Sequence, residues 1–141
     1  MKISIGSDHA GYQVKQRIIE FLSSQDYNID DVGCYSEESV DYPEFGHQVG
    51  KAIISGISNK GIVVCGSGIG MSIAANRDKN IRAGLAFTSE IAKLMREHND
   101  ANVLVLPGRF INVQDALKCI KNFLTTNFEG KRHQNRINKL S

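Results

Sequence analysis

The stretch from residue 61 to residue 76, GIVVCGSGIGMSIAAN, limits the possible folds of this chain more than any other. The run Ile62–Val64 is unbroken and β-branched, which is typical of a strand buried on both faces of a parallel sheet. The run stops at Cys65, and helix-compatible residues begin at Met71. Three glycines at alternate positions connect the two: Gly66, Gly68 and Gly70. The pattern predicts a strand, a tight turn and a helix.

This unit also predicts a binding site. Backbone N–H groups freed by a glycine turn, together with the positive end of a helix, form a site for anions above the strand. Cys65 adds a thiol at the end of the strand. Such surroundings favour thiolate, so we expect the pKa of Cys65 to lie below the usual value of about 8.5.

Strand-like and helix-like segments alternate along the rest of the chain. Strands are expected at 2–6, 28–32, 81–87 and 103–106, and helices at 14–24, 41–53, 88–98, 113–124 and, in a basic tail, about 128–140. Five strands alternating with helices predict a parallel sheet covered on both faces. No linker interrupts the pattern, so residues 1–141 are interpreted as one domain. Ligands of such folds bind beyond the carboxyl edge of the sheet.

Charge and cysteine content exclude several classes of protein. Seventeen basic and fifteen acidic side chains give a net charge of +2, which argues against nucleic-acid and membrane partners. The three cysteines form no CxxC pair and fit reduced thiols better than a disulfide framework. The polar start and the lack of a long apolar run predict neither a signal peptide nor a membrane span. We therefore expect a cytoplasmic protein.

Three loops should meet at the carboxyl edge of the sheet. They carry the candidate residues Asp8, His9, Cys65, Ser67 and Arg109. Most of these have an ordinary alternative: Asp8 could cap a helix, and His9 and Arg109 could be surface residues. Arg132 and Arg136 lie four residues apart and share a helical face, which could equally be a solvated helix end. A catalytic role is favoured most strongly for Cys65, whereas Cys119 suits a buried apolar position.

Three other kinds of site fit the sequence poorly. A dinucleotide fold requires GxGxxG after its first strand, but here Met71 replaces the last glycine and the third strand precedes the turn. The phosphate loop of nucleoside-triphosphate-binding proteins, GxxxxGK[ST], requires a lysine after its last glycine, and no lysine follows the glycines here. His, Cys and carboxylate residues show no metal-ligand spacing, so we expect no metal site.

Taken together, these segments resemble the type B ribose-5-phosphate isomerases of the ribose/galactose phosphate isomerase family. The motifs concerned are GSDHAG at 6–11, DYP at 41–43, CGSGIGMSIAAN at 65–76, REHNDANVL at 96–104, GR at 108–109 and EGKRHQNR at 129–136. The resemblance covers nearly the whole chain. It implies a Rossmann-like three-layer α/β/α sandwich with five parallel strands in the order 2-1-3-5-4. It also implies a homodimer, often paired into tetramers, that needs no cofactor.

The resemblance also assigns roles to individual residues. Cys65 would be the base that moves a proton between C1 and C2 of a sugar phosphate, assisted by Ser67, and Asp8 is a candidate for the hydroxyl protons. His98 would open the furanose ring. The enediolate oxygens would bind backbone N–H groups of Gly66, Ser67, Gly68, Ile69 and Gly70. The remaining contacts would come from Asn99 and Tyr42 to the sugar and from His9, Arg109, Arg132 and Arg136 to the phosphate.

The expected position of His98 predicts a site shared between subunits. A helix that starts near Thr88 at the carboxyl edge and rises about 1.5 Å per residue carries His98 roughly 16 Å away from that edge. A ring-opening acid must lie within about 3 Å of the sugar oxygen. His98 and Asn99 would therefore serve the Cys65 of a neighbouring chain across a two-fold axis.

The resemblance favours an isomerase of ribose 5-phosphate and ribulose 5-phosphate built from identical chains, because this chain carries the base, the ring-opening histidine and the phosphate-binding arginines together. Several alternatives stay open at this point. The substrate could be galactose 6-phosphate, whose isomerase in this family combines two related subunits, or allose 6-phosphate, which differs by one hydroxymethyl group. A non-catalytic module that binds sugar phosphates is also compatible with the anion site.

Overall fold

The computed structural model describes residues 1–140 as a parallel sheet flanked by helices. The strands are β1 (Lys2–Ser7), β2 (Asn28–Gly33), β3 (Lys60–Cys65), β4 (Ala83–Leu85) and β5 (Val103–Pro107). The helices are η1 (His9–Gly11), α1 (Tyr12–Ser24), α2 (Tyr42–Ile54), α3 (Ile69–Ala75), α4 (Ser89–Asn99), α5 (Val113–Thr125) and α6 (Arg132–Ile137). The sheet order β2-β1-β3-β5-β4 confirms the predicted topology.

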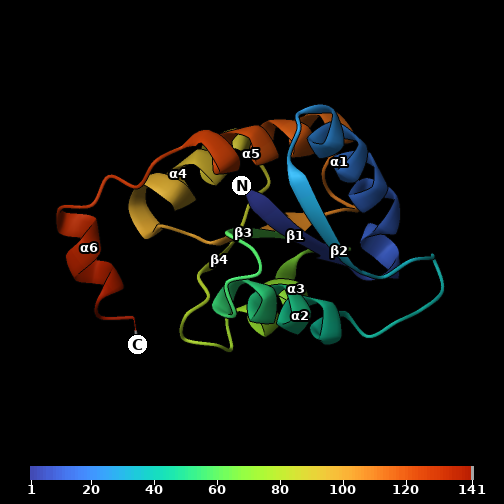
Figure 1. Cartoon of the computed structure of the whole chain (residues 1–141), viewed down its shortest axis with the longest axis horizontal. Helices are drawn as coiled ribbons and strands as arrows, with labels where there is room; N and C mark the ends of the chain where they lie inside the picture. Colours follow the sequence, from blue (N-terminus) through green and yellow to red (C-terminus); the bar gives the residue numbers. More distant parts are fainter. Residues whose placement is uncertain (141) are drawn as a thin grey trace.

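Helices cover both faces of the sheet and form three layers. In Figure 1, α1, α4 and α5 lie on one face, and α2 and α3 lie on the other. Helix α6 stands apart from these layers and contacts the end of α4. Within residues 1–140, no helix is both long enough and apolar enough to cross a membrane.

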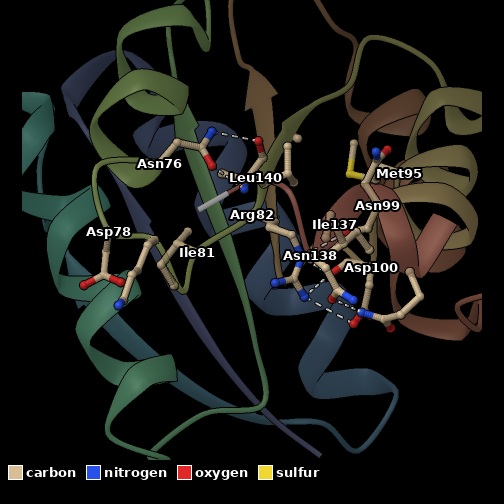
Figure 2. A pocket seen from close by; sticks show the side chains of 15 residues that line it. Asn76, Asp78, Ile81, Arg82, Met95, Asn99, Asp100, Ile137, Asn138 and Leu140 are labelled. Carbon is tan, nitrogen blue, oxygen red and sulfur yellow. Dashed lines mark hydrogen bonds and ion pairs between the residues drawn. The ribbon is translucent and has the colours of Figure 1, made fainter. Parts of the chain in front are cut away.

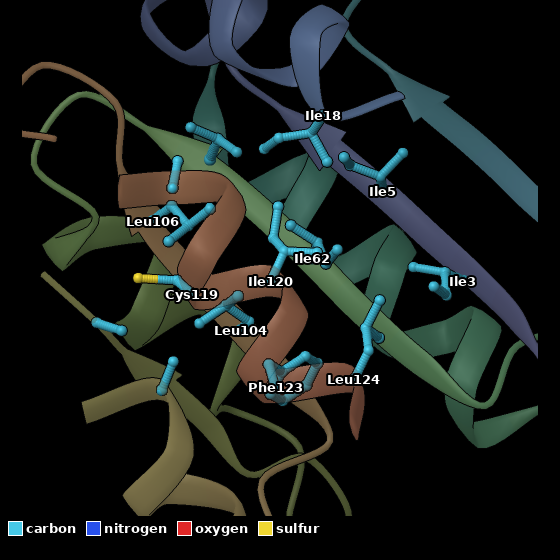
Figure 3. Close-up of a cluster of buried hydrophobic side chains, with 14 of the residues drawn as sticks. Ile3, Ile5, Ile18, Ile62, Leu104, Leu106, Cys119, Ile120, Phe123 and Leu124 are labelled. Atoms are coloured by element: carbon cyan, nitrogen blue, oxygen red, sulfur yellow. The ribbon is translucent and has the colours of Figure 1, made fainter. Parts of the chain in front are cut away.

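Alternating side chains of the central strands build two cores. Ile62 and Val64 of β3 point to the face covered by α5, where they pack with Ile120 and Phe123 (Figure 3). Val63 and Cys65 belong to the cluster on the opposite face. Because side chains alternate along a strand, a strand buried on both faces must be apolar throughout. The β-branched run that predicted β3 therefore lies where it was expected.

Most of the predicted helix starts are also confirmed. The side chain of Thr88 accepts a hydrogen bond from the backbone N–H of Ile91 at 3.2 Å, and Asn112 caps α5 in the same way. Pro43 occupies the first turn of α2, where its missing N–H is not needed.

Two predicted elements are shorter than expected. The strand predicted at 81–87 is limited to Ala83–Leu85 in the structure, because only these residues pair with β5 in regular register. The helix predicted at about 128–140 is limited to Arg132–Ile137. Gly130 and Lys131 have φ angles of 67° and 52°, so the backbone is left-handed just before the helix and no α-helix continues through it.

Candidate active site

Cys65 lies at the carboxyl edge of the sheet, where three loops meet. It pairs with Pro107, the last residue of β5. The backbone N–H of Asp8 donates to the carbonyl of Val64 at 3.2 Å, and that of Gly108 donates to the carbonyl of Cys65 at 2.7 Å. These bonds join the loops after β1, β3 and β5. We call the residues gathered here the Cys65 cluster: Asp8, His9, Tyr42, Cys65, Gly66, Ser67, Gly68, Ile69, Gly70 and Arg109.

The glycine turn folds back over the thiol. Gly68 has a φ of 78°, a left-handed conformation that favours glycine, and its N–H donates to the Sγ of Cys65 at 3.2 Å. The hydroxyl of Ser67 accepts a hydrogen bond from the N–H of Ile69 at 3.2 Å. Helix α3 begins at once with Ile69. The predicted nest of backbone donors around Cys65 is therefore present.

The predicted pKa of the thiol is wrong in direction. Burial raises the pKa of Cys65 above its ordinary value, and the nearby Asp8 carboxylate adds to this increase. Hydrogen bonds from backbone N–H groups, including those of Met71 and Gly68, oppose the increase without cancelling it. Cys65 is only 4% exposed, so the loss of hydration outweighs the donors.

Asp8 both caps a helix and acts on the thiol of Cys65. Its carboxylate accepts a hydrogen bond from the N–H of Gly11 at 3.0 Å, which caps η1, and the residue is only 7% exposed. Its charge acts on Cys65, as described above. His9 is half-buried, and its Nδ1 accepts a hydrogen bond from the N–H of Val40 at 3.2 Å. This bond ties the loop before α2 to the Cys65 cluster.

Tyr42, at the start of α2, and Arg109, in the loop after β5, both approach the glycine turn. A Cβ atom added to Gly70 would come within 2.5 Å of the Tyr42 ring, and one added to Gly66 would lie 3.3 Å from the Cδ of Arg109. Both side chains are exposed. The structure thus brings together an aromatic ring, a guanidinium group and the thiol around one open turn.

The other predicted site residues form a second group, the His98 cluster: His98, Asn99, Arg132, His133 and Arg136. A small cavity of about 220 Å³ is lined by all of them except Arg132, which starts α6. The rings of His98 and His133 stack with their centroids 4.3 Å apart. Burial, the neighbouring Arg132 and His98 lower the pKa of His133. Arg132 and Arg136 are exposed.

The two clusters lie at opposite edges of the sheet. Cys65 pairs with Pro107, whereas α4 ends at Asn99, shortly before the first residue of β5, Val103. Four residues of strand at about 3.3 Å each separate the two edges by roughly 13 Å along β5. One chain therefore does not bring His98 to its own Cys65, in agreement with the sequence-based argument.

A large open cavity adjoins the His98 cluster. It has a volume of about 860 Å³ and lies between α6 and the beginnings of β4 and β5 (Figure 2). Arg82 lines this cavity, and its side chain binds the Asp100 carboxylate at 3.2 Å and the Asn99 carbonyl at 2.9 Å. These contacts fix the last turn of α4, which carries His98.

Sequence spacing missed one group of side chains. His98, Glu129 and His133 each place one ligand atom within 4.8 Å of the others. Their spacing along the chain did not indicate this group, and the expectation of no metal site stays a prediction. Glu129 and His133 lie four residues apart, but the third member comes from α4 and was not evident from spacing.

The fold and site define a class of protein: a parallel α/β domain whose central strand presents a thiol beneath a turn of backbone donors, next to basic side chains suited to an anion. Comparison with known proteins identifies the family within this class. The Ribose/Galactose Isomerase family matches residues 3–140, and the chain belongs to that family.

Three relatives illustrate the similarity. The crystal structure of a ribose 5-phosphate isomerase from Thermotoga maritima is 47% identical, with a TM-score of 0.97 over 99% of this chain and 96% of that one. Ribose-5-phosphate isomerase B of Escherichia coli is 37% identical over 99% of this chain and 94% of its own length. A crystal structure of ribose-5-phosphate isomerase B from Mycoplasma genitalium with bound ribulose-5-phosphate is 40% identical, with a TM-score of 0.93 over 99% and 93% of the two chains.

Proposed function

We propose that this protein is a ribose-5-phosphate isomerase, which interconverts ribose 5-phosphate and ribulose 5-phosphate through an enediolate. One observation carries the proposal: a chain that matches ribose-5-phosphate isomerases over almost its full length places a thiol beneath the glycine turn that ends its central strand. The relative from Mycoplasma genitalium with bound ribulose-5-phosphate supports the choice of a pentose phosphate as substrate.

In this proposal Cys65 acts as the base. Its thiolate removes the proton from C2 of the open-chain aldose and returns it to C1, while a hydroxyl proton passes between O1 and O2. Asp8 and Ser67, which both act on Cys65, are the candidates for that second transfer. N–H groups of the turn stabilise the developing negative charge, and each such donor is typically worth about 10²–10³ in rate.

The remaining contacts divide between the two clusters. His98 protonates the ring oxygen of the furanose and Asn99 binds the sugar. Tyr42, His9 and Arg109 approach from the Cys65 side, and Arg132 and Arg136 approach from the His98 side to bind the phosphate. A planar guanidinium can bind two phosphate oxygens at once, so arginine suits this position better than lysine. Holding the phosphate positions C1 and C2 against the thiol.

The separation of the clusters supports a homodimer with two composite sites. The two sheet edges lie roughly 13 Å apart along β5, and ring opening needs direct contact. A two-fold axis would bring the His98 cluster of one chain to the Cys65 cluster of the other.

Exposed apolar side chains around the Cys65 cluster support the same arrangement. They follow the carboxyl ends of β3, β4 and β5: Ile69 at 57% exposed, Ile73 at 52%, Phe87 at 49%, Ile91 at 44% and Phe110 at 70%. Apolar groups gathered at one edge mark a surface that another protein covers. A second copy of this chain is the partner that would also complete the site. We further propose that the chain works in the cytoplasm, as its three free and buried cysteines favour.

The deciding experiment is turnover by the purified single chain of ribose 5-phosphate, galactose 6-phosphate and allose 6-phosphate, measured side by side. We expect the pentose phosphate to have the highest kcat/KM. A Cys65→Ala variant should lose about 10²–10⁴ in kcat, and a Cys119→Ala variant, which alters a thiol in the core, should keep it. Preference for a hexose phosphate would establish a different substrate. Binding without turnover would identify a sugar-phosphate-binding module instead.

A further inference from the structure

Arg82 is a charged residue just before β4, at the amino edge of the sheet, and the proposed reaction assigns it no role. Its guanidinium group donates to the backbone carbonyls of Asn99 and Asp100 and to the carboxylate of Asp100 (Figure 2). Asn99 is the last residue of α4, and Asp100 follows it. These contacts join the start of β4 to the end of the helix that carries His98.

The planar guanidinium group fits the end of α4 as a fork. Its Nε donates to the carbonyl of Asn99 at 2.9 Å, and its Nη2 donates to the carbonyl of Asp100 at 2.9 Å. The last carbonyls of an α-helix have no partner inside the helix, so a donor from elsewhere satisfies them. A positive charge at this end also interacts favourably with the helix dipole. A lysine ammonium is a point charge and cannot span the same acceptors in one plane.

Two asparagines hold the backbone from which Arg82 extends. The N–H of Arg82 donates to the Oδ1 of Asn102 at 2.8 Å. The next residue, Ala83, forms two hydrogen bonds with the side chain of Asn76, which follows α3. Its N–H donates to the Oδ1 at 2.8 Å, and its carbonyl accepts from the Nδ2 at 2.9 Å. The guanidinium group therefore acts from a fixed part of the backbone.

A second arginine limits what the loss of Arg82 would do. Asp100 has a φ of 45°, and its Oδ1 accepts a hydrogen bond from the Nη1 of Arg96 at 2.8 Å. Arg96 is only 8% exposed, and the same nitrogen donates to the carbonyl of Ala101 at 2.6 Å. Without Arg82, Arg96 still holds Asp100, whereas the carbonyl of Asn99 loses its guanidinium partner. We expect the last turn of α4 to loosen while the fold persists.

We propose that Arg82 is a positioning residue for ring opening, because by holding Asn99 and Asp100 it sets where the imidazole of His98 lies. This inference rests on the role of His98 in the proposed function. A displacement of about 1 Å at a reacting group can cost about 10² in rate. Cys65 lies at the opposite edge of the sheet, so proton transfer between C1 and C2 depends much less on Arg82.

The two pentose phosphates separate ring opening from isomerisation. Ribose 5-phosphate is a furanose that must open before it reacts, whereas ribulose 5-phosphate stays open because its C5 oxygen carries the phosphate. In the full chain with Arg82→Ala, kcat on ribose 5-phosphate should fall about tenfold, a part of the 10²–10⁴ that a general acid contributes. The kcat on ribulose 5-phosphate should stay within about threefold. The matched control is Arg17→Ala, which removes an exposed arginine of α1 and should change neither value.

Guanidinium ions in the buffer test whether the missing group itself is responsible. The side chain of Arg82 is 27% exposed and lines the open cavity of about 860 Å³, so a small cation can reach the space that it leaves. Guanidinium chloride, far below unfolding concentrations, should restore part of the kcat of Arg82→Ala on ribose 5-phosphate. An equal concentration of NaCl should not. Arg82→Lys should show the same selective loss to a smaller degree, and it replaces the alanine variant where that variant does not fold.

The outcomes separate this inference from the proposed function. In an active wild type, equal losses on both substrates, no loss on ribose 5-phosphate, or rescue by NaCl as strong as by guanidinium would overturn the positioning role. A KM for ribulose 5-phosphate that rises about tenfold in Arg82→Ala would show that the guanidinium group binds the phosphate directly, and would also overturn it. A wild type that converts neither pentose phosphate would refute the proposed function itself.

Discussion

Gly11 is the position where a single methyl group should damage both the fold and the site. A Cβ atom added there would lie 2.5 Å from the carbonyl oxygen of Val64 and 2.7 Å from its carbonyl carbon. These are backbone atoms of β3, directly before Cys65, so they cannot rotate away. The φ of Gly11 is −98°, which any residue can adopt, and the cost of Gly11→Ala is therefore steric rather than conformational.

The magnitude follows from these contacts. An ordinary van der Waals contact requires η1 to move away from β3 by roughly 1 Å, and overpacking of this kind costs about 1–3 kcal/mol. The N–H of Gly11 also donates to the Asp8 carboxylate. Its loss adds about 1 kcal/mol. We expect Gly11→Ala to lower the free energy of unfolding by about 2–4 kcal/mol. A displacement of about 1 Å at the reacting groups can reduce kcat by about 10².

The assay combines urea unfolding with turnover of ribose 5-phosphate. The matched control is Gly50→Ala, a helical glycine of α2 where the added Cβ would lie 3.4 Å from the nearest atom, a side-chain carbon of Ile81. This variant should be stabilised by about 0.5–1 kcal/mol, since alanine favours a helix interior. Wild-type stability and kcat in Gly11→Ala would refute the close packing of η1 on β3.

Three further predictions concern separate features of the chain. Burial raises the pKa of Cys65, and the thiolate is the active form. The rise of kcat/KM with pH should therefore have an apparent pKa above the ordinary value of a thiol. An apparent pKa below that value would contradict the burial argument. Arg132→Lys or Arg136→Lys should raise KM by about tenfold and also lower kcat, because lysine cannot form the paired hydrogen bonds of a guanidinium to the phosphate. Unchanged kinetics would show that these arginines are solvated helix residues. Lys15 is fully buried and its Nζ binds Asp31 at 2.6 Å, so Lys15→Met should cost about 3 kcal/mol in urea unfolding. Adding Asp31→Asn should restore part of that loss, and a purely additive effect would show that the pair does not interact.

The central unit of the fold could be predicted because its signals are local. The β-branched run, the alternating glycines and the helix-compatible residues each determine the structure within a few positions. The cap at Thr88 and the proline at position 43 are equally local. The strand order came from the resemblance to a family, since the periodicity of a sequence does not state which strands pair.

Features that depend on distant neighbours could not be predicted in this way. The pKa of Cys65 was expected to fall because the donors of the turn are visible in the sequence, whereas its burial depends on the packing of α2, α3 and β5. The meeting of His98, Glu129 and His133 depends on the contact between the end of α4 and the segment that leads into α6. The late start of α6 depended on the positive φ of Lys131, a conformation that its residue type does not predict.

The measurement that tests the shared site most directly is complementation between two inactive variants. Cys65→Ala and His98→Ala chains are each assayed alone on the cyclic sugar and then mixed under conditions of verified subunit exchange. In a mixed homodimer with composite sites, one site carries both substitutions and the other carries none. Random reassortment makes half of the dimers mixed, so roughly a quarter of all sites should be active. Recovery to about a quarter of wild-type activity is the predicted result. No recovery after exchange would place His98 and Cys65 in the same chain's site and contradict the account.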